Sequence, residues 1–290
     1  VITSLSLEHQ SILGNTLREI ASEKAGIVKP RRPVVTVQQP PEAMEIIRQK
    51  AQSMNSKIHV VGTSPGLHLD YKEQTAWATR PLTMPCSLQL PNGTRHVQLP
   101  LIGKHQLLNA AAAVGAALQL APAGIKINST AMVCGLEKTA WPARLEIIQE
   151  DPLLIIDGAH TPDACQQLVE TLSLLRANNV HLIFGSGSDK NASAMLNIMS
   201  PLVSNTYLCA SKHPRATRTE DNLTIAAKLG LEAQQFSSVP DALRAAELAA
   251  RSEETILVTG SIFVAAEARQ AKGLANEIDP GGILEMEPRH

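Results

Sequence analysis

The run Leu153-Leu154-Ile155-Ile156-Asp157-Gly158-Ala159-His160-Thr161-Pro162 decides the fold class of this chain. Four consecutive aliphatic residues are typical of a strand that is buried on both faces. Thr161 suits the N-cap of a helix, and Pro162 suits its first position. A buried strand that turns directly into a helix is the repeating unit of α/β domains, so this run predicts an α/β fold.

The same alternation continues after this run. The pattern predicts strands at 153–157, 180–185, 205–210, 232–236 and 255–260, with helices at 162–176, 192–202, 220–229 and 240–251. Strands and helices that alternate at this spacing form a mostly parallel sheet wrapped by helices. We therefore expect a second domain over residues 140–272, followed by a loose tail at 273–290.

The N-terminal part shows a different pattern. It predicts strands at 1–7, 32–38 and 57–62 and helices at 16–25 and 41–54, where Thr16 and Glu19 match a capping box and Gly26 a C-cap. Short alternating stretches between 68 and 100, with an Asn92-Gly93 turn, predict a small antiparallel sheet with a hairpin. An Ala-rich helix at 105–120 and a poorly patterned stretch to 138 complete the expected domain 1–139.

Composition excludes several classes of protein. The 290 residues carry a formal net charge of -1 and only 2% aromatic residues, which argues against a nucleic-acid partner. No apolar run reaches membrane length, and no signal peptide is visible. Four widely spaced cysteines form no metal-binding pattern and predict core thiols in a reducing compartment, so we expect a cytoplasmic protein. Because the chain opens on Val1 in a strand-like segment, we expect further sequence upstream.

Two polar residues of the first domain are candidates for chemistry. Lys24 falls on the same face of its predicted helix as Leu17 and Ile20, where an unpaired buried charge is costly. Alternatively, Lys24 reaches solvent near the end of a short helix. His9 follows the first predicted strand, at the end where open α/β sheets bind ligands. His9 is therefore either a ligand of a metal or phosphate, or a solvated loop residue.

Two further pairs of candidate residues come from other parts of the chain. His105 and Asn109 lie four residues apart on one face of the Ala-rich helix, where they either bind a base or serve the helix itself. Asp157 and His160 lie in a turn before helix amides that attract phosphate, although the Asp157 carboxylate is also suited to binding backbone amides.

Arg144 lies just beyond the expected domain junction. Its guanidinium is suited to clamping a phosphate, or to an ion pair with Glu146 or Glu137. The small-residue loop 185–189 is not a Walker A motif, and no GxxxxGK[ST] occurs in the chain. Neither domain shows GxGxxG after a first strand, which disfavours a dinucleotide-dependent oxidoreductase.

Several blocks in a fixed order resemble the folylpolyglutamate synthase/dihydrofolate synthase family of the Mur-type ligases. The blocks are Ile2-Thr3-Ser4-Leu5-Ser6-Leu7-Glu8-His9, Leu13-Gly14-Asn15-Thr16, Glu23-Lys24-Ala25-Gly26-Ile27-Val28-Lys29-Pro30, Leu101-Ile102-Gly103-Lys104-His105-Gln106-Leu107-Leu108-Asn109-Ala110, Trp141-Pro142-Ala143-Arg144-Leu145-Glu146, Asp157-Gly158-Ala159-His160 and Val258-Thr259-Gly260-Ser261. The resemblance spans nearly the whole chain. It implies the C-terminal part of a P-loop-type ATPase domain followed by a Rossmann-like α/β domain, without the phosphate loop.

The resemblance also implies roles for individual residues. Lys24 would be carbamylated and would help to hold Mg²⁺ near the phosphates, and His9 would be a metal ligand. Asn109, Arg144, Asp157 and His160 would contact ATP, at a site expected between the two domains.

The implied reaction transfers the γ-phosphoryl group of ATP to a carboxylate of dihydropteroate or tetrahydrofolate, and the amine of L-glutamate then displaces phosphate. Mg²⁺ and Arg144 would offset the charge that develops on the transferred group. The resemblance implies no nucleic-acid or membrane partner, and we expect a monomer.

Three positions depart from the family pattern. Glu8 stands where the family has Asp, Thr161 where it has Asn, and Ala143 where it has Gly before the phosphate arginine. The last change would strain the backbone if the site needs a positive φ. Without a phosphate loop we expect the chain to be inactive alone. The alternatives are another Mur-type ligase that acts on a cell-wall precursor, and a non-catalytic nucleotide-binding protein.

Overall fold

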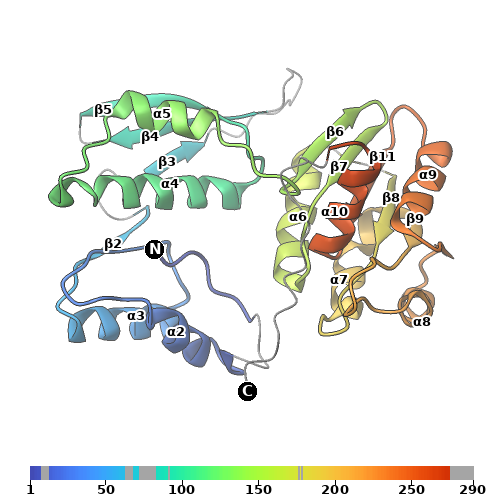
Figure 1. Ribbon diagram of the computed structural model, residues 1–290, viewed down its shortest axis with the longest axis horizontal. Helices are drawn as coiled ribbons and strands as arrows, with labels where there is room; N and C mark the ends of the chain where they lie inside the picture. The colour runs from blue at the N-terminus through green and yellow to red at the C-terminus, as the bar shows by residue number, and fades with distance from the viewer. Residues whose placement is uncertain are drawn as a thin grey trace. The chain divides into compact units, whose positions relative to one another are not determined.

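The computed structural model describes residues 1–7, 13–62, 68–71, 83–90, 92–175, 177 and 179–274. The chain divides into two compact units, Val1–Trp141 and Pro142–His290 (Figure 1). Most of the predicted tail, from residue 275 onward, lies outside the described residues. Within the described ranges, no helix combines the length and the apolar character that a membrane span requires.

The second unit is built on one six-stranded sheet in the order β10-β9-β8-β11-β7-β6. The strands are β6 (Glu146–Glu150), β7 (Leu153–Ile156), β8 (Val180–Phe184), β9 (Val203–Leu208), β10 (Ala233–Gln235) and β11 (Thr255–Thr259). All neighbouring pairs are parallel except β6 with β7. The predicted parallel sheet is therefore confirmed, with one antiparallel edge strand that the sequence pattern did not predict.

Helices cover both faces of this sheet. They are α6 (Pro162–Leu174), α7 (Ala192–Met199), α8 (Thr219–Lys228), α9 (Val239–Ala249) and α10 (Ile262–Ala271), with a 3₁₀ turn at Ser200–Leu202. The helices α6, α7 and α8 pack against one another in sequence, and α9 packs against α10. The chain moves across the sheet in one direction from β7 to β10 and then returns to β11, so right-handed connections place α9 on the opposite face.

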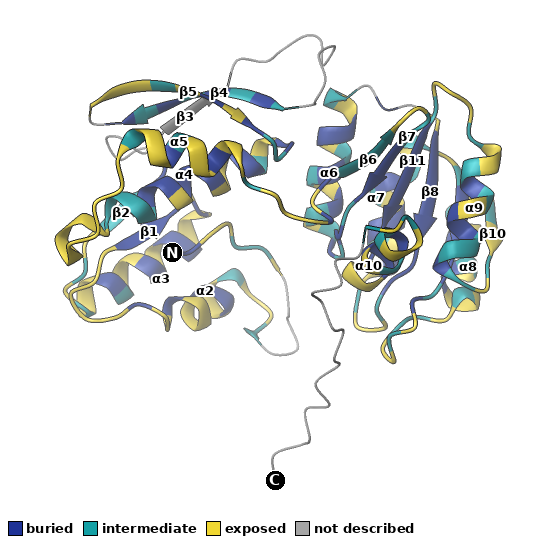
Figure 2. Ribbon diagram, turned by 45° about the horizontal axis from the view of Figure 1, so that its top comes forward, coloured by how far each residue is buried: buried dark blue, intermediate teal, exposed yellow. Residues whose placement is uncertain are grey.

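The core of the second unit follows from the apolar strands. Every residue of β8 and of β11 is buried, and Figure 2 shows both strands in dark blue. Aliphatic side chains from β7 and β11 pack with the buried faces of α9 and α10 in one cluster that includes Ile156, Val258 and Ala265. Strands that are buried on both faces read as continuous apolar runs, which is why the sequence pattern located them.

The first unit begins with a small parallel sheet. The strands β1 (Val34–Thr36) and β2 (Ile58–Val60) pair in parallel, and Ile2 forms an isolated bridge with Thr36. The helices α2 (Leu17–Ala25) and α3 (Pro41–Ser53) pack against each other. Ile2, Val34 and Ile47 share one buried cluster, which joins the opening segment to the sheet and to α3.

The predicted strand at 1–7 is wrong as a regular strand. After the bridge at Ile2, the side chain of Gln39 takes over the pairing: its amide donates to the carbonyl of Thr3 at 2.8 Å and accepts from the amide of Leu5 at 3.0 Å. A buried side-chain amide therefore satisfies the backbone groups that a neighbouring strand would satisfy.

The rest of the first unit is an antiparallel sheet with two helices. The strands β3 (His68–Tyr71), β4 (Met84–Leu90) and β5 (Gly93–Leu99) pair in that order, which confirms the predicted sheet and hairpin. Helix α4 (Lys104–Leu118) contacts β1 and β3, and it is followed by a 3₁₀ turn at Ala121–Ala123. Helix α5 (Ser129–Glu137) packs on β5; the sequence pattern did not predict it.

Candidate active site

The turn after β7 is organised by the carboxylate of Asp157. One of its oxygens accepts the backbone amide of Leu145 at 2.7 Å, and the other accepts the amide of Ala159 at 2.8 Å. The Nδ1 atom of His160 lies 2.9 Å from the carbonyl oxygen of Gly158. Because that oxygen can only accept, Nδ1 carries the hydrogen, and Nε2 is the nitrogen without a hydrogen in the neutral ring.

Helix α6 begins directly after this turn, as predicted. Thr161 is the N-cap, its hydroxyl accepts the amide of Ala164 at 3.2 Å, and Pro162 occupies the first turn. The helix N-terminus adds partial positive charge beside the turn. The nearby Asp157 carboxylate acts in the opposite sense on Cys165, whose fully buried thiol has its pKa raised to about 12 by burial and by that charge.

The turn also lies at a switch in the direction of the chain connections. The amide of Asp157 donates to the carbonyl of Val258 at 2.9 Å, and the amide of Gly260 donates to Ala159 at 3.0 Å, so the ends of β7 and β11 meet here. Helix α6 leads away from β7 on one face, whereas α10, which packs against α9, leads away from β11 on the other. Ligands of open α/β sheets bind in such crevices at the carboxyl ends of strands.

Arg144 sits in a tight turn of unusual backbone geometry. Ala143 has a φ of 55° and Leu145 a φ of 46°, so both neighbours of Arg144 lie in the left-handed region. Each such residue costs on the order of 1 kcal/mol or more when it is not glycine. The strain that we predicted for Ala143, where the family has glycine, is therefore present, and it extends to Leu145.

Side-chain burial is divided sharply within this turn. The residues Ala143 and Leu145 are 3% and 5% exposed, whereas Arg144 is exposed. Among the described residues the guanidinium has no ion pair or hydrogen bond, so neither of the pairs considered for it, with Glu146 or Glu137, is formed. An arginine without a partner, on a turn held in a costly conformation, is free to bind an anion.

The geometry places that guanidinium against the turn after β7. A Cβ atom on Gly158 would lie 3.3 Å from Nη1 of Arg144 and 2.8 Å from Cδ1 of Ile262. Glycine at 158 therefore leaves the space in which Arg144 approaches the α6 N-terminus. The structure brings Arg144, Asp157 and His160 together in the second unit, and the combined positive charge of guanidinium and helix N-terminus suits a phosphate.

Lys24 lies in the last turn of α2 in the first unit. The buried residues of the helix are Ile20, Ala21 and Ala25, and Lys24 itself is exposed, as the solvent alternative expected. Its side chain also lines a pocket of about 280 Å³ with Ile20, Ile27 and residues 1–6 of the opening segment. Within the described part of the chain, the ammonium group has no ion pair or hydrogen bond.

Among the described residues, the pocket beside Lys24 offers hydroxyl oxygens rather than carboxylates. Thr3, Ser4 and Ser6 line it, and His9, the predicted metal ligand, lies outside the described residues. The described residues contain no cluster of three or more His, Cys, Asp or Glu that could hold a metal ion. Hydroxyl oxygens suit a hard cation such as Mg²⁺, whereas a protonated lysine repels one, so Lys24 fits this role only as the carbamate.

Asn109 lies on α4, where it is exposed. Its amide donates to Oε1 of Gln106 at 3.2 Å, and Gln106 itself is 6% exposed. The Asn109 side chain therefore bonds the residue three positions earlier on the helix, Gln106. The buried Gln106 fixes the orientation of the Asn109 amide.

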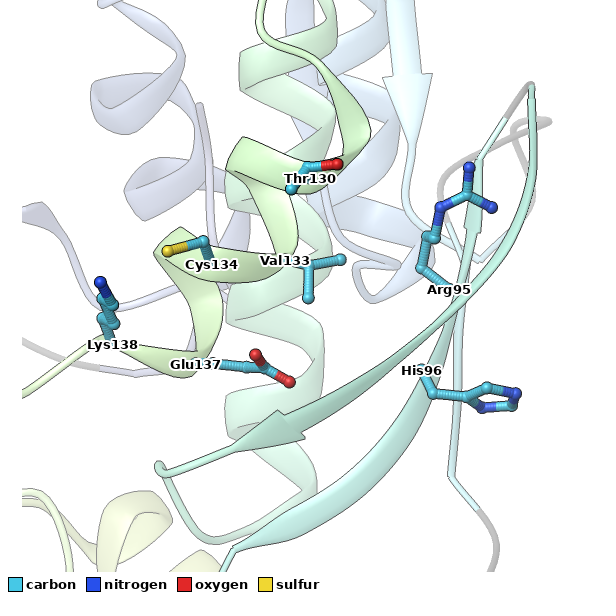
Figure 3. Close-up of a pocket in the computed structure, with 7 residues that line it drawn as sticks. All are labelled: Arg95, His96, Thr130, Val133, Cys134, Glu137 and Lys138. Atoms are coloured by element: carbon cyan, nitrogen blue, oxygen red, sulfur yellow. The ribbon is translucent and has the colours of Figure 1, made fainter.

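A second pocket lies between β5 and α5 (Figure 3). In this view Glu137 extends from the end of α5 towards β5, where its carboxylate accepts the backbone amide of Gln98 at 3.0 Å. Arg95 Nη1 donates to the carbonyl of its neighbour Thr94 at 2.9 Å. The contact between Glu137 and Gln98 joins α5 to the antiparallel sheet.

Two residues that contact the Arg144 turn or its support were not identified in their observed contacts by the sequence analysis. Glu146 was considered only as a partner of Arg144, yet its Oε2 accepts the amide of Ala143 at 2.8 Å and Nε of Arg269 at 2.8 Å. Arg269 comes from the last turn of α10, a helix that the pattern did not predict. Because the two residues are 123 positions apart in sequence, no local signal could have joined them.

Two family models match the chain. Residues 1–117 match the Mur ligase middle domain, and residues 143–262 match the Mur ligase glutamate ligase domain. The dihydrofolate synthase/folylpolyglutamate synthase of Bacillus subtilis (strain 168) is 32% identical over 93% of this chain and 61% of that protein. The folylpolyglutamate synthase of Lacticaseibacillus casei is 30% identical over 93% of the chain and 61% of its own length.

Solved structures show the same similarity. The structure of E. coli FolC in complex with DHPP and ADP superposes with a TM-score of 0.79 at 26% identity, over 94% of this chain and 61% of that one. A folylpolyglutamate synthase of Mycobacterium tuberculosis complexed with ADP shares the fold, with a TM-score of 0.81 at 24% identity over 94% and 63% of the two chains. The chain thus spans about three fifths of the length of these relatives, including 61% of FolC.

Proposed function

Because the chain belongs to the folylpolyglutamate synthase/dihydrofolate synthase family of the Mur-type ligases, we propose that the protein is an ATP-dependent ligase that joins L-glutamate to a folate-type carboxylate. The observation that carries this proposal is the guanidinium of Arg144, which has no partner among the described residues and lies beside Gly158 in the turn that leads into α6. It lies inside the region that matches the glutamate ligase domain. The complex of E. coli FolC with ADP supports a nucleotide ligand.

The proposed reaction has two steps. The carboxylate of dihydropteroate or tetrahydrofolate attacks the γ-phosphorus of ATP, which forms an acyl phosphate and releases ADP. The amine of L-glutamate then attacks the acyl carbon, the bond to phosphate breaks, and the amine loses a proton as the amide forms. Both steps concentrate negative charge on phosphoryl oxygens, so forked donors at that position lower the barrier.

Arg144 supplies those donors in the proposal. Its guanidinium binds phosphoryl oxygens, and the α6 N-terminus attracts the same charge. Asp157 keeps the turn in place through the amides of Leu145 and Ala159 and contacts the nucleotide with its remaining lone pairs. His160, fixed by its bond to Gly158, presents Nε2 to the nucleotide. Asn109 of the first unit also contacts ATP.

Lys24 has a separate role in the proposal. Its neutral amine adds CO₂ and releases a proton, and the resulting carbamate helps to hold Mg²⁺ together with hydroxyl oxygens of the pocket and His9. When bound, Mg²⁺ would neutralise charge on the ATP phosphates. An exposed lysine beside three hydroxyl groups is accessible to CO₂, which supports the modification.

The proposal is tested by ATP-dependent phosphate release from the full-length protein. The assay contains Mg²⁺, L-glutamate and either dihydropteroate or tetrahydrofolate. Release that requires both glutamate and a pterin is the expected result, and the pterin that supports it distinguishes the two activities. Release with a cell-wall precursor in place of the pterin would instead assign another Mur-type ligase. Tight nucleotide binding without turnover on any carboxylate would assign a non-catalytic protein.

A further inference from the structure

The turn that presents Arg144 is held from three sides. The Asp157 carboxylate accepts the amide of Leu145 at 2.7 Å, and the carbonyl of Ala143 accepts the amide of Gly158 at 2.9 Å. On the third side, Oε2 of Glu146 accepts the amide of Ala143 at 2.8 Å. A backbone with two left-handed residues persists only where its surroundings fix it in this way.

The Glu146 carboxylate is itself held by Arg269. The Nε atom of Arg269 donates to the same oxygen, Oε2, at 2.8 Å, and the two side chains are 18% and 25% exposed. Glu146 is the first residue of β6, and Arg269 lies in the last turn of α10. The pair therefore joins the outer strand of the sheet, a helix on one of its faces and the backbone of the Arg144 turn at a single oxygen atom.

We propose that Glu146 and Arg269 are positioning residues for Arg144. The carboxylate of Glu146 keeps Ala143 in its left-handed conformation, and Arg269 keeps that carboxylate in place. The guanidinium of Arg144 is thereby directed to the turn at Gly158 before any phosphate binds. A catalytic donor that is oriented in advance loses little freedom in the transition state, so its support contributes to affinity and rate without touching the substrate.

The ordinary alternative is an ion pair that only fastens α10 to the sheet. The chain supplies a matched control for it, because Lys272 at the end of α10 pairs with Glu247 of α9 at 2.8 Å, with exposures of 27% and 30%. This pair resembles the first in length, exposure and helix, but it does not touch the Arg144 turn. Glu247→Ala therefore reports what the loss of such an ion pair does to the helix alone.

Limited proteolysis tests the positioning independently of the proposed function. In the full-length protein, Glu146→Ala is expected to speed tryptic cleavage after Arg144 about tenfold, because the amide of Ala143 loses a charged acceptor. Cleavage after Arg218, which is 76% exposed in the same unit, serves as the internal standard. Glu247→Ala is expected to change neither rate, and Glu146→Gln, which keeps an acceptor oxygen, is expected to restore most of the protection.

A mutant cycle with Arg144 tests the consequence for ligand binding, and this arm rests on the proposed function. Glu146→Ala is expected to weaken ATP binding about tenfold, and Arg144→Ala is expected to weaken it more. In the Arg144→Ala background, Glu146→Ala is expected to have no further effect on ATP binding. An equal loss in both backgrounds, or cleavage unchanged relative to Glu247→Ala, would overturn the positioning role alone. Unaltered ATP binding in Arg144→Ala would instead overturn the proposed role of Arg144 in binding phosphate.

Discussion

Lys24 and Arg144 are both exposed cations without a partner among the described residues, yet the chain positions them by different means. Lys24 lies on a helix whose ends are fixed by residues next to it in sequence. The N-terminus has a complete capping box at Thr16 and Glu19, and the C-terminus has a C-cap at Gly26. Arg144 stands on a turn whose backbone is unfavourable by itself and is held by residues far away in sequence. The backbone that carries Lys24 depends on local sequence, whereas the turn that carries Arg144 depends on the assembled domain.

The largest expected effect is a loss of turnover that distinguishes Lys24 and Arg144 from ordinary surface charges. In the full-length protein, Lys24→Ala and Arg144→Ala are each expected to lower turnover at least about 10³-fold, because in the proposed reaction both act on the charge of the transferred phosphoryl group. Steady-state phosphate release measures this, with the exposed Lys29→Ala as the control. Added bicarbonate is not expected to rescue Lys24→Ala, and near-normal turnover in that variant would remove Lys24 from the metal site.

Alanine substitutions at two glycines compare how closely the backbone is packed at one position in each unit. Gly260 has a φ of 100°, and a Cβ there would lie 2.7 Å from the carbonyl oxygen of Gly185. Gly124 in the first unit has a φ of 87°, and among the described residues an added Cβ would meet no heavy atom within 4 Å beyond its own chain neighbours. Gly260→Ala is expected to destabilise the protein by about 3 kcal/mol or more, and Gly124→Ala by about 1 kcal/mol. Urea unfolding of both variants checks the order; equal losses would contradict it.

The local capping of the helix that carries Lys24 predicts a smaller effect on stability. Thr16→Ala removes the hydroxyl that accepts the amide of Glu19 and is expected to cost about 1 kcal/mol. Hydrogen bonds from the amides of Asn15 and Thr16 lower the pKa of Glu19. The stability from this carboxylate is therefore present above the ordinary Glu pKa and is lost as the pH falls through the lowered value. Thermal unfolding of Glu19→Gln should lack this acid-dependent part.

The smallest expected effect is the chemical modification of cysteines in the folded protein, which measures how well thiols in both units are buried. Burial raises the pKa of Cys86 to about 11 and those of Cys165 and Cys209 to about 12, whereas Cys134 is exposed. At pH 8 an alkylating reagent is expected to modify Cys134 alone in the folded protein and all four thiols after denaturation. Mass spectrometry of tryptic peptides identifies the sites. Rapid modification of Cys165 would show that α6 opens readily.

The sequence predicted what local patterns determine. Continuous apolar runs located β7, β8 and β11, and capping residues located the starts of α2 and α6. The departure at Ala143 predicted a strained backbone, since glycine at that position implies a positive φ. Family motifs supplied Arg144, Asp157 and His160, and the structure brings these three together.

What the sequence could not predict depends on distant contacts. The strand β6 is interrupted by an irregularity after Ile147, pairs only at the sheet edge and has no fully buried residue, so it has no clear alternation. The helix α10 mixes small and apolar residues around its circumference, and its ion pair with Glu146 spans 123 positions. The opening strand failed for a related reason, because Gln39, rather than another strand, satisfies the backbone of Thr3 and Leu5.

The strand order has a consequence for how the second unit is made. β11 lies between β7 and β8, although among the described strands of the unit it is the last to leave the ribosome. Until residues 255–259 emerge, β7 and β8 lack their common neighbour, and the turn at Asp157 lacks the carbonyl of Val258. Pairings between distant segments form slowly and leave strand edges exposed to aggregation meanwhile. The turn that carries Asp157 is therefore completed only after residues 255–259 have been synthesised, when β11 is inserted between β7 and β8.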